Sequence, residues 1–158
     1  MKKPVSDILR NAEANLRTGQ EMAEASAFVV QKRLEKLAGA AVDPIRADHA
    51  ELGLMGSEKV EAFTASAGAA SHAAFEMGET CTDIARRNSD QLQSNLDALS
   101  RETNEAKRLA LQTEQVAQFW GQAMVDGMAL WSQGLSAQAK IMAPLHARVT
   151  ENAKRLKD

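Results

Sequence analysis

The sequence predicts an all-α protein whose long amphipathic helices form a helical hairpin, a bundle or a coiled coil and assemble into oligomers. Good helix formers dominate the chain, which has only three prolines in 158 residues, and apolar residues recur at steps of three and four rather than alternating as in strands. Bulky core residues are scarce, since aromatic residues make up 4% of the chain and its mean hydropathy is -0.34. Such helices bury little apolar area alone, so we expect a homo-oligomer such as a trimer or tetramer.

The first segment, residues 7–38, has the apolar spacing of one amphipathic helix. Leu9, Leu16, Val30 and Leu34 belong to its apolar row, and Ser6 or Asp7 is suited to cap its start. Residues 39–56 hold three glycines and Pro44, which indicates a turn or linker. We therefore divide the chain into an N-terminal helix with its linker, residues 1–48, and a helical domain, residues 49–158.

A second helical pattern begins at Ser57, a candidate N-cap, and carries a heptad-like seam typical of helices that pack side by side. Its large members, which we expect at an oligomer interface, are Val60, Phe63, Met77, Ile84, Leu92, Leu96 and Leu99. Cys81 lies on the same seam, where we expect a small buried thiol. The seam slips near residues 87–90, which read RNSD. This slip fits either a continuous helix or a turn between two antiparallel helices.

Residues 117–135, AQFWGQAMVDGMALWSQGL, contain both tryptophans of the chain. At about 100° per residue, the large apolar side chains of this stretch fall within one arc that spans roughly half of a helix. These side chains are Phe119, Trp120, Met124, Met128, Leu130, Trp131 and Leu135. The opposite side is polar and rich in glutamine. An arc this broad indicates a helix that meets something flat and apolar, either a partner helix or a surface that is not protein. Further on, Pro144 should kink or stop the helix.

Charge and motif content exclude several classes of function. The formal net charge is -2 and basic residues are interspersed with acids, so we expect no nucleic-acid partner. A single cysteine allows no internal disulfide, and no segment has the pattern of a signal peptide or membrane span. We therefore expect a cytoplasmic protein.

Catalytic and metal-binding chemistry also find little support in the sequence. His72, Glu76, Glu79 and Asp83 share one helical face, which permits a weak metal site, although a solvated polar stripe is the favoured interpretation. No catalytic residue, metal or cofactor is expected.

Two parts of the sequence resemble the phasin family, the coat proteins of bacterial polyhydroxyalkanoate (PHA) granules, of which polyhydroxybutyrate is one polymer. These are LGLMGSEKVEAFTAS at residues 52–66 and the run from Leu109 to Val149, with its glutamine and phenylalanine to proline spacing. The resemblance implies a non-catalytic helical protein that adsorbs on the polyester and controls granule size and coalescence. It also implies contacts with the polyester synthase or depolymerase.

Two other functions fit the residues. One is a soluble helical scaffold or chaperone-like protein that uses the same apolar face to bind exposed apolar protein surfaces. The other is a metal-dependent enzyme built on a helical bundle.

Overall fold

The computed structural model describes residues 5–47 and 49–157, apart from the side chains of residues 52 and 55. It consists of three α-helices, α1 (Val5–Val42), α2 (His49–Arg101) and α3 (Glu105–Arg155). No strand occurs in the described residues, and the expected all-α class is confirmed. Residues 1–4 and 48, which belong to the expected N-terminal segment, lie outside the described residues.

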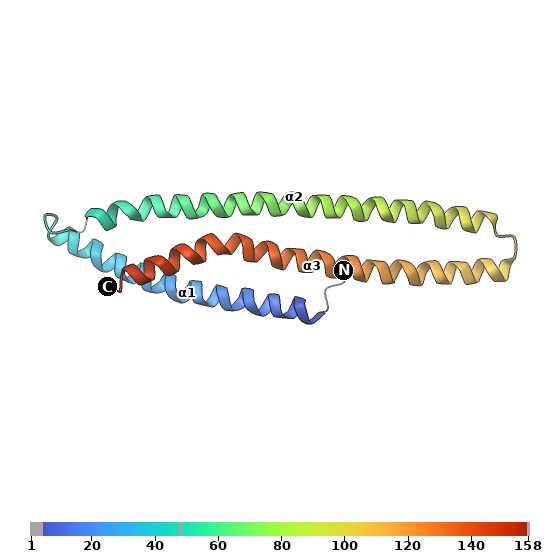
Figure 1. The fold of residues 1–158 in the computed structure, drawn as a ribbon, viewed down its shortest axis with the longest axis horizontal. Coiled ribbons are helices and arrows are strands. Elements are labelled where there is room, and N and C mark those ends of the chain that lie inside the picture. Colours follow the sequence, from blue (N-terminus) through green and yellow to red (C-terminus); the bar gives the residue numbers. More distant parts are fainter. Residues whose placement is uncertain (1–4, 48, 158) are drawn as a thin grey trace.

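The three helices form an elongated, open bundle with α3 in the middle (Figure 1). α2 and α3 run antiparallel as a long hairpin, and α1 lies along the half of α3 that leads to the C-terminus. Both α1 and α2 pack on α3, but they share few contacts with each other. The far half of the hairpin is therefore not covered by a third helix.

The break between α1 and α2 lies where Pro44 predicts it, but it is shorter than expected. α1 ends at Val42, and α2 already begins at His49 rather than at Ser57. The hydroxyl of Ser57 donates to the carbonyl of Leu54 within the helix (3.3 Å), so Ser57 is not an N-cap. Gly53 and Gly56 are helical, each at a cost of up to about 1 kcal/mol relative to alanine. Tertiary contacts made by this first part of α2, described below, offset that cost.

The turn between α2 and α3 lies at residues 102–104, and α2 passes through residues 87–90 without a break. Of the two interpretations of that region, the continuous helix is correct. Asn104 ends the turn, because its side-chain Oδ1 accepts a hydrogen bond from the backbone N–H of Lys107 (3.1 Å). This is an ordinary N-cap, which satisfies one of the unpaired N–H groups at the start of α3.

Pro144 does not stop α3, which continues to Arg155. The helix bends within its C-terminal third (Figure 1), where Pro144 lies. A proline inside a helix removes one backbone hydrogen bond and crowds the preceding turn, which accounts for a bend of this kind.

The surfaces along which the helices pack within one chain are made mostly of small or polar residues. Ile8 and Val29 are the only large apolar side chains among the described residues that are more than nine-tenths buried, and each contributes about 1.5–3 kcal/mol. The other residues in this class are Asn15, Glu51, Glu58, Ala62, Ser66, Ala73, Asp126, Ser132, Asn152 and Ala153. A single chain is therefore held together by few apolar contacts.

Candidate surface-binding faces

The aromatic arc of α3 is exposed. Trp120, Met124 and Trp131 are 67%, 69% and 64% exposed and follow one another along the helix at steps of four and seven. The ring of Phe119 meets that of Trp120 edge to face, with centroids 5.6 Å apart. Met128, Leu130 and Leu135 are half-buried. The helix thus presents a row of large apolar side chains to the outside, here called the aromatic face and defined by Trp120, Met124 and Trp131.

The same helical stripe continues toward the C-terminus beneath α1. Leu135 and Met142 follow Trp131 at steps of four and seven, which keeps them on the same side of α3. Asn15 of α1 donates to the backbone carbonyl of Leu135 (2.8 Å), and a Cβ atom at Gly19 would lie 3.7 Å from Cε of Met142. The aromatic face is therefore the uncovered part of a longer stripe, and α1 occupies the rest.

The seam expected on α2 is not the surface that packs against α3. Val60 and Phe63 are more than 60% exposed, and Leu92 and Leu96 are almost as open. Met77, Ile84 and Leu99 are half-buried. The residues that α2 buries are instead Glu51, Glu58, Ala62, Ser66 and Ala73. The seam lies beside this buried row and is open along much of its length, so its role in an oligomer stays a prediction.

α1 also carries two rows of different character. Ile8, Asn15, Met22 and Val29, spaced by seven residues, form the inner row, whose members are buried or half-buried. The apolar residues that predicted the helix point elsewhere: Leu9, Leu16, Val30, Leu34 and Leu37 are between 46% and 65% exposed. They form the outer row, which the described part of the chain leaves largely open.

An apolar groove of about 500 Å³ opens where the three helices come together. Val30 and Leu34 line it from α1, Phe63 from α2, and Leu145 and Val149 from α3. Part of the outer row and part of the α2 seam thus face a shared hollow on one side of the molecule. Its lining suits apolar side chains, and of the charged residues that line it, Arg33, Glu58 and Arg148 take part in ion pairs.

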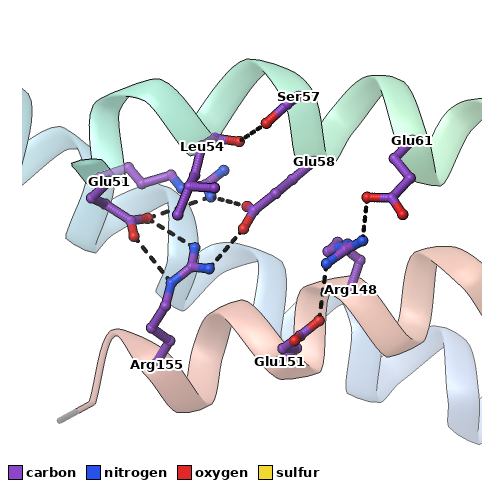
Figure 2. Close-up of polar contacts among 9 residues, drawn as sticks. Glu51, Leu54, Ser57, Glu58, Glu61, Arg148, Glu151 and Arg155 are labelled. Atoms are coloured by element: carbon purple, nitrogen blue, oxygen red, sulfur yellow. Dashed lines mark hydrogen bonds and ion pairs between the residues drawn. The ribbon is translucent and has the colours of Figure 1, made fainter. Parts of the chain in front are cut away.

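A buried ion cluster closes this end of the molecule (Figure 2). Arg155 contacts Glu51 (Nε to Oε2, 3.0 Å) and Glu58 (Nη1 to Oε1, 2.7 Å). Arg33 contacts the same two carboxylates, Glu58 at 2.8 Å and Glu51 at 3.5 Å. Both glutamates are 5% exposed. The cluster therefore joins α1, α2 and α3 and anchors the glycine-containing start of α2.

The charge state of Glu58 follows from these contacts. Burial alone would raise its pKa, but hydrogen bonds from Arg155 and then Arg33 outweigh burial and hold the pKa below the ordinary value of 4.5. The carboxylate is thus ionised at neutral pH. Nearby, Arg148 bridges Glu61 of α2 and Glu151 of its own helix, a more exposed arrangement at the same end (Figure 2).

Cys81 is exposed, so the expectation of a buried thiol is wrong. Cys81 lies on an open part of the α2 seam, beside the row that packs inside the chain, which explains the error. Of the residues considered for a metal, His72 contacts Glu76 (3.2 Å), whose carboxylate is also held by Lys140 (3.3 Å). Within the described residues, no group of three or more potential ligands is arranged to hold a metal ion.

These features define an elongated helical protein that offers open apolar faces rather than an enclosed site. A protein-family model described as Phasin protein matches residues 52–149, more than half of the chain. The chain belongs to the phasin family, and is thus a non-enzymatic protein associated with PHA granules. No curated protein and no solved structure matches it. The matched region lies within α2 and α3, so α1 is outside it.

Across the part of the chain that the structure describes, no helix is both long enough and apolar enough to cross a membrane.

The ion cluster was not predicted from the sequence, because its members are separated by up to 122 residues and no local pattern connects them. These members are Arg33, Glu51, Glu58 and Arg155.

Proposed function

We propose that this phasin coats PHA granules through the aromatic face of α3 and thereby limits granule size and coalescence. The observation that carries the proposal is the exposure of Trp120, Met124 and Trp131 in one row. Large aromatic side chains are usually buried, and a contiguous exposed apolar row marks a binding surface. On a polyester surface the row would release ordered water, and each tryptophan buried there would contribute on the order of 2–3 kcal/mol.

The polar side of α3 supports the second half of the proposal. Gln118 of this helix contacts Glu114 (3.1 Å), and both side chains are exposed, which gives a hydrated polar surface apart from the tryptophans. A coat with its apolar side on the polymer and its polar side in water keeps two granules from merging. We place the coated granules in the cytoplasm, where the polyester synthase and depolymerase would meet the polar side.

Self-association is a second part of the proposal, and the open α2 seam supports it. Leu92 and Leu96 are each 58% exposed, on the half of the hairpin that α1 does not reach. Pairing of such seams between copies would bury the apolar area that one chain leaves in water. We infer a homo-oligomer such as a tetramer, joined through α2, with the aromatic faces of α3 free to meet the polymer.

The experiment that tests the adsorbing face is the double substitution Trp120→Gln with Trp131→Gln. We expect binding to polyhydroxybutyrate particles to weaken by about a hundredfold or more, because two large aromatic contacts are lost. Helix content and oligomer size should change little. In the unmodified protein, tryptophan fluorescence should shift to the blue when particles are added, as the indoles leave water.

The matched control is Leu92→Gln with Leu96→Gln, which removes two equally exposed apolar side chains from α2. We expect this control to reduce oligomer size while each chain still binds particles. If the tryptophan variant instead dissociates the oligomer and its chains still coat particles, the aromatic face is an oligomer interface. The adsorbing face would then lie elsewhere, and the α2 seam from Val60 to Ile84 would be the next candidate. If neither the variants nor the unmodified protein bind particles, the alternative function as a soluble scaffold would be favoured.

A further inference from the structure

The stripe on which the aromatic face lies is only half available in the folded chain. α1 covers its continuation, as shown by the contact of Asn15 with the backbone of Leu135 (2.8 Å) and by the approach of Gly19 to Met142. The uncovered half carries Trp120 and Trp131. A second apolar area of the same helix, with Leu135 and Met142 half-buried, is thus partly covered by α1.

Few apolar contacts attach α1 to this area of α3. Among the described residues of α1, only two large apolar side chains, Ile8 and Val29, are more than nine-tenths buried. Asn15, which is polar, lies between them in the sequence. Asn15 also donates to Oε1 of Gln138 (3.2 Å). Other polar contacts between α1 and the C-terminal part of the chain include Glu21 with His146 at the edge (Oε2 to Nε2, 3.3 Å) and the ammonium of Lys157 over the ring of Phe28 (5.7 Å). Exposed polar contacts of this kind contribute little in water.

α1 is itself suited to an apolar surface. Leu9, Leu16 and Val30 each follow one residue after a member of the inner row, so the outer row lies about 100° further round the helix. If α1 leaves α3, the two rows together form an apolar arc across roughly half of the helix, as in helices that lie in an interface plane. The outer row is already open, so α1 can touch the polymer before the inner row is released.

The chain connections allow this movement. Residues 43–46, which follow α1, are all exposed and lie outside any helix. The region matched by the phasin family model, residues 52–149, contains most of α2 and α3, including the aromatic face, but not α1. Arg33 ties the base of α1 to Glu58 (2.8 Å), near this connection. α1 is therefore an additional helix attached at one end, while its other end, near Ile8, rests on the middle of α3.

From these observations we propose that α1 is a releasable cover over a second polyester-binding face. In solution α1 packs on α3; on the granule the end of α1 near Ile8 swings away from α3, while the ion pairs of Arg33 keep the base of α1 on the cluster. The C-terminal half of the α3 stripe, with Leu135 and Met142, then meets the polymer together with both rows of α1. This inference rests on the proposed function, since the same polyester is the ligand of both faces.

Spin labels test the movement directly. The labels are attached at Glu21→Cys and His146→Cys, whose native side chains are in contact and partly exposed, in a chain whose exposed Cys81 is replaced by alanine. We expect strong dipolar coupling between the labels in solution and its loss when the protein adsorbs on polyhydroxybutyrate particles. Coupling that persists on the particles would overturn the proposal.

A second labelled pair serves as the control. Gln115 Nε2 of α3 donates to the backbone carbonyl of Asn95 in α2 (3.2 Å), so labels at Asn95→Cys and Gln115→Cys report on the hairpin. We expect this pair to stay coupled on the particles. Loss of coupling in both pairs would mean general unfolding on the surface, which contradicts a specific release of α1.

A reversible clamp then links the movement to binding. A short, reducible bismaleimide between the cysteines at positions 21 and 146 should weaken particle binding by about tenfold or more, because the apolar side chains of the inner row are withheld. Reduction of the linker should restore binding. Clamped protein that binds as well as unclamped protein would refute the cover, while the proposed function would stand. Failure of every form, including the unmodified protein, to adsorb would refute the proposed function itself.

Discussion

Replacement of Glu58 by glutamine tests how much the ion cluster contributes to the fold. Glu58 accepts hydrogen bonds from Arg33 (2.8 Å) and Arg155 (2.7 Å) while 5% exposed. Glutamine keeps one oxygen acceptor but loses the negative charge, so one of the two arginines loses its bond to position 58 and the other donates to a neutral oxygen. Charge-assisted bonds are worth about 1.5–3 kcal/mol each and neutral ones about 1. Because Arg155 is partly exposed and screened by water, we expect a net loss of about 2 kcal/mol.

The assay is urea unfolding followed by helical circular dichroism at one fixed protein concentration, since oligomerisation makes stability depend on concentration. Glu61→Gln is the matched control: it is the same substitution, three residues further along α2, at a side chain that is 71% exposed and contacts Arg148. We expect the control to cost less than about 0.5 kcal/mol. Equal stability of the two variants would refute the reasoning, because burial of the cluster would then carry no weight.

The acid dependence provides a second readout of the same variant. The pKa of Glu58 is lower in the folded chain than its ordinary value of 4.5, because the hydrogen bonds from Arg155 and Arg33 outweigh burial. Its contribution is therefore fully present above pH 4.5 and is lost as the pH falls through the lowered pKa. We expect the stability difference between the unmodified chain and Glu58→Gln to shrink over that acidic range and to stay constant above it.

Two further outcomes are expected. Sedimentation of the unmodified protein at micromolar concentration should show more than a monomer, because the outer row of α1 and the α2 seam remain largely open in one chain; a compact monomer with a melting transition independent of concentration would contradict this. Cys81→Ala should change stability by less than about 0.5 kcal/mol and polymer binding by less than about twofold, since the thiol is exposed; a folded variant that no longer binds particles would indicate thiol chemistry instead.

The elements that local chemistry determines could be predicted from the sequence, and those set by distant partners could not. Pro44 marks the end of α1 correctly, because proline constrains its own neighbourhood. Gly53 and Gly56 suggested a linker, but the ion pairs of Glu51 and Glu58 with arginines far away in the sequence favour a helix there. The sequence offers two polar stretches where a turn could lie, residues 87–90 and residues 102–104. The structure has the turn at 102–104, where Asn104 caps the start of α3.

The candidate faces show the same division. Apolar periodicity finds the rows with large side chains, and it identified the aromatic arc and the α2 seam. It does not reveal which row packs inside the chain, because the inner row includes Asn15 and the buried row of α2 includes Glu58 and Ser66. A search for apolar periodicity passes over buried polar residues, even where these residues contact a neighbouring helix. The intrachain packing was therefore missed where polar contacts define it.

The elongated shape of the molecule sets how much protein a granule would need. α3 has 51 residues, so at 1.5 Å per residue the molecule is about 75 Å long. With neighbouring helices about 10 Å apart, a chain lying on its side would cover on the order of 2,000 Å². Roughly 50,000 chains lying side by side would then cover one square micrometre of polymer. A compact bundle with the same number of residues would be shorter and would cover less polymer per chain, so the elongated arrangement covers a granule with fewer chains.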